Sequence, residues 1–103
     1  MRRKTRLDRE IKIGSIIIRY NRRIENHIAK HNVTIGEIQR ALEQDYLIRN
    51  LGGRDWVILC RDPVSGRYLV VFLHMLRKLE FRLKTAREMT ESEKRFYKKK
   101  FRR

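Results

Sequence analysis

The amino-acid sequence predicts one α+β domain, in which helices cover one face of an antiparallel meander of four consecutive strands. The chain has 103 residues, 41% of them hydrophobic, which is enough for one modest core and too little for two domains. β-branched and aromatic runs with a period of two indicate strands, and apolar residues at helical spacing behind capping residues indicate helices. Because neighbouring segments usually pack together, the expected order is β-α-α-β-β-β-β-α.

The N-terminal segment predicts an arm followed by a strand. Residues 1–10 contain five basic and two acidic side chains with few apolar ones, so we expect a basic, flexible arm. The domain is expected to span residues 11–103, with order beginning near Ile11. The β-branched run at residues 16–20 predicts the first strand of that domain.

Two helices are expected between this strand and the meander. Asn21 is a typical N-cap for a helix that reaches about His31, and Asn32 suits its end because asparagine tolerates the left-handed conformation. Thr34 is expected to begin a second helix, with Glu37 three residues later completing a capping box. The apolar positions at helical spacing predict the buried faces of the two helices: Ile24, Ile28, Ile35, Ile38, Ala41 and Leu42.

The hydrophobic period changes to two after the second helix. Gly52-Gly53 and the Asp-Pro-Val-Ser-Gly loop at residues 62–66 are expected to connect strands of a meander. In the last strand leucine and phenylalanine alternate with cations, so Arg82 and Lys84 are expected on the opposite face. The predicted strands span residues 46–51, 56–61, 68–75 and 79–85.

Positive charge dominates the composition. Lys and Arg number 27 against 12 Asp and Glu, which gives a formal net charge of +15. Thr90 and Glu93 predict a second capping box for a final helix to about Phe101, in a C-terminal region dense with lysine and arginine. A surface charged for solubility alone would carry balanced signs. We therefore expect a polyanionic partner, RNA ahead of a membrane surface.

Cysteine use and hydropathy indicate a cytoplasmic protein. The single cysteine, Cys60, cannot form an intrachain disulfide, and it lies in an apolar run that suits a small buried side chain. No apolar stretch approaches the length of a membrane span. Lys12 and Gly14 interrupt the apolar residues that follow the basic N-terminus, so we expect no signal peptide and no membrane partner.

Two stretches of the chain resemble one known family. Residues 27–34, HIAKHNVT, resemble the helix corner of BrnT-type toxins. Residues 81–90, FRLKTAREMT, followed by Glu93 and Tyr97, are similar to the strand-to-helix ending of the same family. The two stretches stand in the expected order, separated by a predicted meander, and the resemblance covers about residues 16–98.

This resemblance implies a RelE-like fold and a metal-independent ribonuclease toxin of a type II toxin–antitoxin module, which cleaves RNA and inhibits growth. The implied partners are RNA and a cognate antitoxin, commonly of the ribbon-helix-helix type, in a toxin–antitoxin hetero-oligomer. It implies no cofactor. Asn32 stands where the family usually has glycine, and Thr85 where it often has serine. Asparagine adopts the same backbone region as glycine, and threonine keeps the hydroxyl, so both changes are mild.

Metal-free cleavage by a 2′-hydroxyl requires a proton acceptor, cations for the pentacovalent phosphate and a proton donor for the leaving oxygen. Arg87 and Arg82 match the two motif arginines of the family, and a guanidinium binds two phosphate oxygens at once. Arg87 is the first candidate, although it could instead pair with a glutamate or hold a loop carbonyl. His31 is the candidate for proton transfer, with packing at a helix end as its alternative. Tyr97 is either core packing or a base-stacking group.

Other cations are candidates for phosphate contacts, although any single surface cation can simply be solvated. His27 and His31 stand one helical turn apart, but without a third partner they are a weak indication of metal, and no metal site is predicted. The chief alternative function is a non-enzymatic RNA- or DNA-binding module on the same fold, and a structural assembly protein is the third. The candidate RNA-binding residues are Lys30, Arg54, Arg61, Arg67, Lys84 and Lys98.

Overall fold

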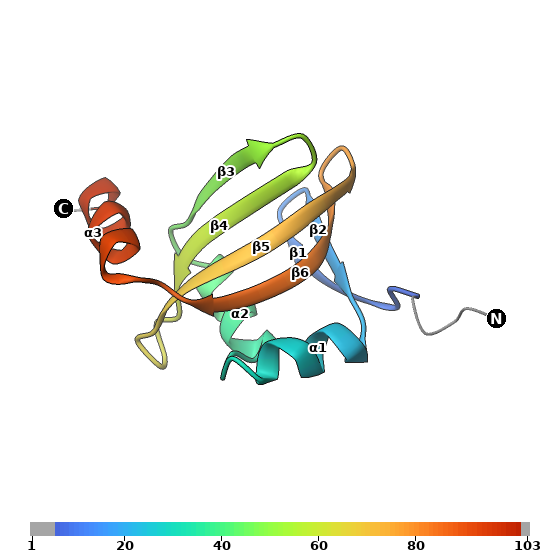
Figure 1. Cartoon of the computed structure of the whole chain (residues 1–103), viewed down its shortest axis with the longest axis horizontal. Helices are drawn as coiled ribbons and strands as arrows, with labels where there is room; N and C mark the ends of the chain where they lie inside the picture. The colour runs from blue at the N-terminus through green and yellow to red at the C-terminus, as the bar shows by residue number, and fades with distance from the viewer. Residues whose placement is uncertain (1–5, 102–103) are drawn as a thin grey trace.

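In the computed structural model, which describes residues 6–101, the chain forms a six-stranded mixed sheet with three helices (Figure 1). The spatial order of the strands is β1-β2-β6-β5-β4-β3. The α+β class predicted from the sequence is therefore confirmed. The elements are β1 (Arg9–Ile13), β2 (Ile16–Tyr20), α1 (Arg22–Ala29), α2 (Ile35–Leu42), β3 (Leu47–Gly52), β4 (Asp55–Arg61), β5 (Tyr68–Arg77), β6 (Glu80–Glu88) and α3 (Glu91–Lys100).

The four consecutive strands β3 to β6 form the predicted antiparallel meander. The loop between β4 and β5 closes as expected, because the Gly66 amide donates to the Asp62 carbonyl at 2.8 Å and Gly66 has a φ of 79°. Alternation in β6 is also confirmed, since Phe81 and Leu83 are buried whereas Arg82 is half-buried and Lys84 is exposed. The meander thus presents a row of cations on one face.

The N-terminal region differs from the prediction. A strand that sequence reasoning missed, β1, begins at Arg9 and pairs antiparallel with β2, so the ordered domain starts before the expected boundary at residue 11. The pairing buries Ile11 against Ile18, which outweighs the charged residues on either side. Residues 1–5 of the predicted arm lie outside the described residues. Strand β2 is parallel to β6, which makes the sheet mixed rather than antiparallel throughout.

The helices lie on both faces of the sheet, so the prediction that all of them cover one face is wrong. Helices α1 and α2 pack on the face that contains Ile58 and Leu69, whereas α3 packs against the opposite face, which we call the open face. The physical reason is that β4 and β5 carry apolar residues on both faces, and each face needs a cover. Tyr97 of α3 covers one end of the open face, over Val57, Leu59, Val70 and Met89.

Local signals for helix ends are confirmed. The Asn21 side chain accepts from the Ile24 amide at 2.9 Å, and capping boxes are present at Thr34 and Thr90. Asn32 adopts a φ of 62°, the left-handed conformation expected after α1. These caps fix where each helix begins and how the chain turns between α1 and α2.

Strand β6 has a free edge along its second half. Strand β2 pairs only with residues Glu80 to Arg82, so within the described residues the second half of β6 has no strand on that side. The register with β5 shifts between Phe72 and Leu73, and Lys84 is the additional residue of this bulge. Helix α1 lies beside β6 and brings its C-terminal end toward that edge (Figure 1).

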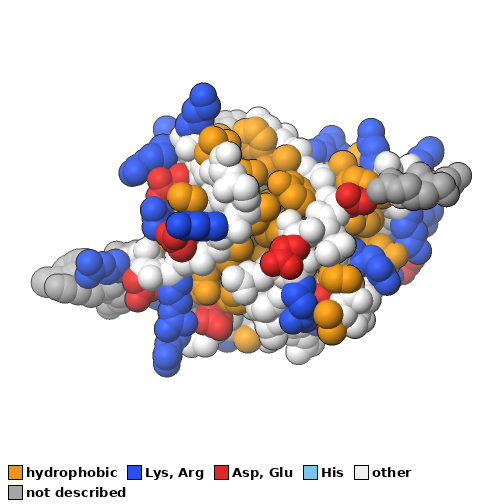
Figure 2. Space-filling model, turned by 180° about the vertical axis from the view of Figure 1, so that it is seen from behind, with side chains coloured by type: hydrophobic (Ala, Val, Ile, Leu, Met, Phe, Trp, Pro, Cys, Tyr) orange, Lys and Arg blue, Asp and Glu red, His pale blue; other side chains and the backbone are white. Residues whose placement is uncertain are grey.

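Charged and apolar side chains separate on the surface. Seen from behind the view of Figure 1, hydrophobic side chains gather near the middle of the molecule, and Lys and Arg project mainly around its edge (Figure 2). Cys60 is fully buried, as expected, and its burial raises the pKa of its thiol to about 12. A thiolate nucleophile at this position is therefore excluded near neutral pH.

Candidate active site

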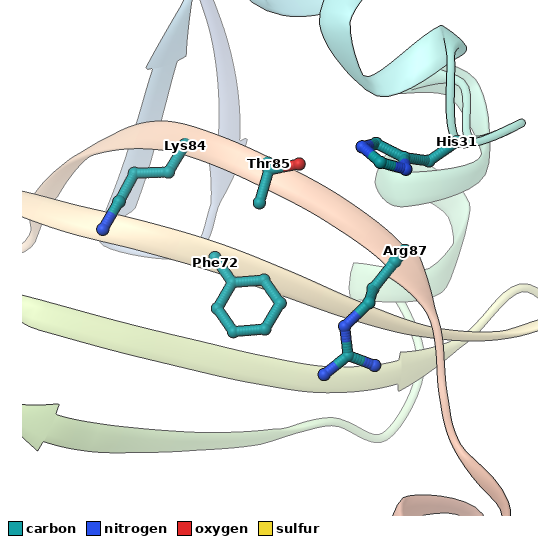
Figure 3. A pocket seen from close by; sticks show the side chains of 5 residues that line it. All are labelled: His31, Phe72, Lys84, Thr85 and Arg87. Atoms are coloured by element: carbon teal, nitrogen blue, oxygen red, sulfur yellow. The ribbon is translucent and has the colours of Figure 1, made fainter.

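A pocket of about 330 Å³ lies at the free edge of β6. It is lined by His31, Phe72, Lys84, Thr85 and Arg87 (Figure 3). The His31 ring reaches in from the end of α1 and faces the side of β6 that carries Thr85 and Arg87 (Figure 3). Three residues predicted as site residues from distant parts of the sequence, His31, Lys84 and Arg87, thus share one pocket.

The turn after α1 is held against the sheet by Arg67. Its Nη1 donates to both carboxylate oxygens of Glu37 at 3.0 Å and to the carbonyl of Asn32, and its Nε donates to Glu88 at 2.8 Å. Arg67 was predicted to contact RNA, but these donors bind the protein itself. Its contacts fix the residue that follows His31, so Arg67 acts as a positioning residue for the pocket.

The guanidinium of Arg87 forms more hydrogen bonds to the protein than the ammonium of Lys84, the other cation of the pocket. Its Nη1 and Nη2 donate to the two oxygens of Glu93 at 2.9 and 3.0 Å, and Nη1 also donates to the Glu88 carbonyl at 3.0 Å. Hydrogen bonding to Glu93 raises the pKa of Arg87, and the same bond lowers the pKa of Glu93. The guanidinium carbon lies 5.3 Å from the centre of the Phe72 ring. The expected alternative, a pair with a glutamate, is therefore present.

The pairing with Glu93 leaves some N–H donors of Arg87 free for a ligand. A guanidinium has five N–H donors, and the three contacts described above use three of them. The Nε donor and one Nη2 donor remain for a ligand, on a side chain that is 39% exposed. Glu93 therefore orients the cation toward the pocket without using all of its hydrogen-bonding capacity.

A second polar cluster adjoins the pocket through Lys84. Asp55 accepts from Lys84 Nζ at 3.4 Å and lies 3.2 Å from His74 Nδ1, which is opposite Arg82 in the sheet. The hydrogen bond with His74, and then that with Lys84, lowers the pKa of Asp55. Sequence reasoning singled out neither Asp55 nor His74, although the alternation of β5 places His74 on the same face as Phe72. Within residues 6–101 Arg82 forms no ion pair.

The remaining predicted site residues lie elsewhere. Tyr97 does not line the pocket: it is 7% exposed, and its hydroxyl donates to the Asp45 carbonyl at 2.7 Å. Burial raises the pKa of Tyr97 to about 12, which fits the packing interpretation. Arg61 and Lys98 lie over the Tyr68 ring at 5.3 and 5.2 Å.

Two further predicted contacts are also outside the pocket. Arg54 lies at the opposite end of the meander, where its Nη1 donates to the Met75 carbonyl at 3.1 Å. Lys30 is exposed next to His31 and offers a charge beside the pocket rather than within it.

A groove of about 400 Å³ continues from the pocket toward α3. Phe72 and Arg87 line both the pocket and the groove. The floor of the groove is apolar and its far wall is formed by α3, which also contributes Ser92 and Phe96. Phe72 and Phe96 were not candidates from the sequence because aromatic residues at such spacing usually pack in cores, and no pattern in the sequence pointed to Ser92.

Residues 6–101 contain neither a metal-binding cluster nor a membrane-spanning helix. In that part of the chain no three His, Cys, Asp or Glu side chains are placed to hold a metal ion together. His27 and His31 contact each other edge to face, with ring centres 5.4 Å apart. No helix in the described range combines the length and apolar character needed to cross a bilayer.

The fold and the pocket define a small α+β protein with a cationic pocket at the free edge of a mixed sheet. No family model, no curated protein and no solved structure matches this chain. The resemblance of the two sequence motifs to BrnT-type toxins therefore stays a prediction.

Proposed function

We propose that this protein is a metal-independent endoribonuclease that acts in the cytoplasm as the toxin of a type II toxin–antitoxin module. The observation that carries the proposal is the meeting of His31, Lys84 and Arg87 in one pocket beside the Phe72 ring. A proton carrier and two cations supply part of what RNA cleavage without a metal requires, and an aromatic ring is a surface on which a base can stack. The BrnT-like motifs supply the toxin part of the proposal.

The proposed reaction is attack of a ribose 2′-hydroxyl on the adjacent phosphorus. The 2′-oxygen forms a bond to phosphorus, its proton passes to His31, and the bond to the 5′-oxygen of the next nucleotide breaks. The leaving 5′-oxygen takes up a proton from water, and protonated His31 then returns its proton to the hydroxide left behind, so the products are a 2′,3′-cyclic phosphate and a 5′-hydroxyl. Arg87 and Lys84 stabilise the additional negative charge on the phosphate in the transition state.

The partner proposed for regulation is a cognate antitoxin, most simply of the ribbon-helix-helix type, in a hetero-oligomer that blocks the pocket. The motif resemblance supports this partner. The net charge of +15 supports RNA as the ligand, because phosphates relieve the repulsion among 27 basic side chains.

The test is cleavage of RNA by purified protein in EDTA, with identification of the new ends. We expect wild-type protein to produce 2′,3′-cyclic phosphate ends and His31→Ala to cleave roughly 100-fold more slowly. His27→Phe is the matched control, since it removes an exposed imidazole of the same segment that does not line the pocket but keeps an aromatic ring against His31. Equal loss in both variants, or cleavage that EDTA abolishes, would contradict the proposal.

Two observations favour the alternative, a nucleic-acid-binding module without catalysis. Lys84 and Arg87 each already contact a carboxylate, Asp55 and Glu93 respectively. His31 is the one imidazole that lines the pocket among the described residues, so a second proton carrier has to come from elsewhere. Salt-dependent RNA binding by the wild type, with no cleavage and no growth arrest on expression, would support this alternative.

A further inference from the structure

We infer that the groove between the open face and α3 is a nucleobase subsite, and that the ligand of this protein is single-stranded RNA with one base stacked in that groove. The inference deepens the proposed function and rests on it for the choice of RNA as ligand. It assigns a role to Phe72, Phe96 and Arg49, which the proposed reaction does not otherwise need.

The shape and polarity of the groove suit a flat apolar ring. Its floor consists of Val57, Leu59 and Val70, which are 8%, 6% and 1% exposed. They belong to the apolar part of the open face that also packs against Tyr97 of α3. Its volume of about 400 Å³ falls within the range of roughly 300–1,000 Å³ that is typical of small-molecule sites. Leu51, 57% exposed, extends the apolar surface at the rim.

Each of two aromatic rings that line the groove has an arginine guanidinium in a cation–π contact with it. The guanidinium of Arg87 lies 5.3 Å from the centre of the Phe72 ring, and that of Arg49 lies 5.3 Å from the centre of the Phe96 ring. Apart from its contact with Phe96, Arg49 forms no hydrogen bond or ion pair within residues 6–101. Aromatic rings and guanidinium planes are the two surfaces on which unpaired bases stack, and the same cations attract phosphates.

The groove and the pocket share Phe72 and Arg87, so one nucleotide can occupy both. A base that stacks on Phe72 from the groove side carries its phosphate toward Arg87 and the pocket. The base in the groove therefore belongs to a nucleotide that flanks the reactive phosphate. A base within a duplex is paired and stacked on its neighbours, so it cannot enter a groove of this kind, and single strands are selected.

The α3 wall of the groove offers little for reading the identity of the base. Both oxygens of Glu93 accept from Arg87, and one also accepts from the Thr90 amide, so three of its roughly four acceptor sites are used. The Ser92 hydroxyl has no protein partner within residues 6–101 and is the remaining polar group of the α3 wall. With stacking as the main interaction, we expect tolerance of sequence and a modest preference set by stacking strength.

The test is fluorescence anisotropy with wild-type protein and a labelled 2′-O-methyl RNA oligonucleotide, which cannot undergo attack by a 2′-hydroxyl. Three ligands are compared: the single strand, its blunt duplex, and the same strand with abasic positions that keep every phosphate. We expect affinity to fall at least about tenfold for both the duplex and the abasic strand, as for the loss of one stacked base. Equal affinity for the intact and abasic strands would overturn the inference.

A pair of variants assigns the effect to the groove. Phe96→Leu keeps an apolar side chain against the core but removes the aromatic surface, and we expect it to weaken binding of the intact strand and not of the abasic one. Lys99→Ala, on the same helix, is the matched control for loss of a charge outside the groove. If Phe96→Leu binds the intact strand like wild type, the groove serves another occupant, such as a partner peptide, and the inference is wrong.

The outcome is separable from that of the proposed function. Absence of cleavage together with base-dependent binding would remove the nuclease proposal and leave the subsite. Cleavage by wild type with unchanged binding and rate in Phe96→Leu would remove the subsite and leave the nuclease.

Discussion

Replacement of Arg87 by alanine separates its structural contacts from its role at the phosphate. Arg87 pairs with Glu93 through side chains that are 39% and 30% exposed, and a pair this accessible stabilises a fold by only about 0.2–1 kcal/mol. Its position over the Phe72 ring contributes about 0.5–1 kcal/mol more. Arg87→Ala should therefore cost about 1–2 kcal/mol of the free energy of unfolding, which leaves a typical domain folded.

The expected effect on cleavage is much larger. A preorganised donor to a developing charge in a transition state contributes about 2.7–4 kcal/mol, or a factor of roughly 100 to 1,000 in rate. Arg87→Ala should lose that factor, and Arg87→Lys should recover part of it, because lysine restores the charge but not the bidentate geometry. Glu93→Gln removes the charge of the ion pair, but the glutamine amide oxygen can still accept from the guanidinium and keep it oriented, so this variant should cleave within a few-fold of wild type.

The assay is single-turnover cleavage of a short RNA by each variant, with unfolding in denaturant measured in parallel. The reasoning is refuted if Arg87→Ala cleaves at the wild-type rate, because the cation would then be structural only. It is also refuted if Arg87→Ala and Glu93→Gln lose equal activity in proportion to their loss of stability. In that case the ion pair itself, rather than the guanidinium at the phosphate, would be what matters.

Two further predictions concern stability and charge. The Asp62 carboxylate is fully buried and accepts from Arg40, itself partly exposed, at 2.9 and 2.7 Å, so Asp62→Ala should lower the free energy of unfolding by about 1–3 kcal/mol at pH 7. Arg40 holds the pKa of Asp62 well below its usual value, so this contribution is present above the unfolded pKa of about 3.9 and is lost as pH falls below it. Denaturant unfolding at pH 7 and pH 2 should show the difference shrinking, and a constant difference would contradict the assignment. Lys84→Ala should reduce the slope of log affinity for RNA against log salt concentration by about one, whereas Arg67→Ala should leave it unchanged. If the two variants have the same slope of log affinity against log salt concentration, Lys84 does not contact a phosphate.

The Arg67 network shows why a basic side chain in the sequence is a poor guide to its role. Arg67 was expected to contact RNA, and its charge alone is consistent with that. In the fold it contacts Glu37, Glu88 and the Asn32 carbonyl, three partners that are 30, 21 and 35 residues away in the chain. Because each partner comes from a different element, only the assembled core reveals that this arginine holds the turn beside the pocket.

The sequence by itself determined the local features of this protein. Caps at Asn21, Thr34 and Thr90, the left-handed Asn32 and the alternation of β6 all follow from interactions among residues a few positions apart. Such interactions depend on backbone sterics and on short-range hydrogen bonds, so they can be predicted without knowing the fold. The meander followed in the same way from short turns between apolar strands.

Tertiary structure alone decided how these elements combine. The β1 strand, the parallel pairing of β2 with β6 and the position of α3 on the open face depend on which apolar faces remain to be covered after the meander forms. The candidate site has the same origin, since His31, Phe72 and Arg87 meet through packing between segments far apart in the chain. Residue types and spacing identified cations and a histidine, but the free edge of β6 and the groove beside it arise only when the sheet and its helices are assembled.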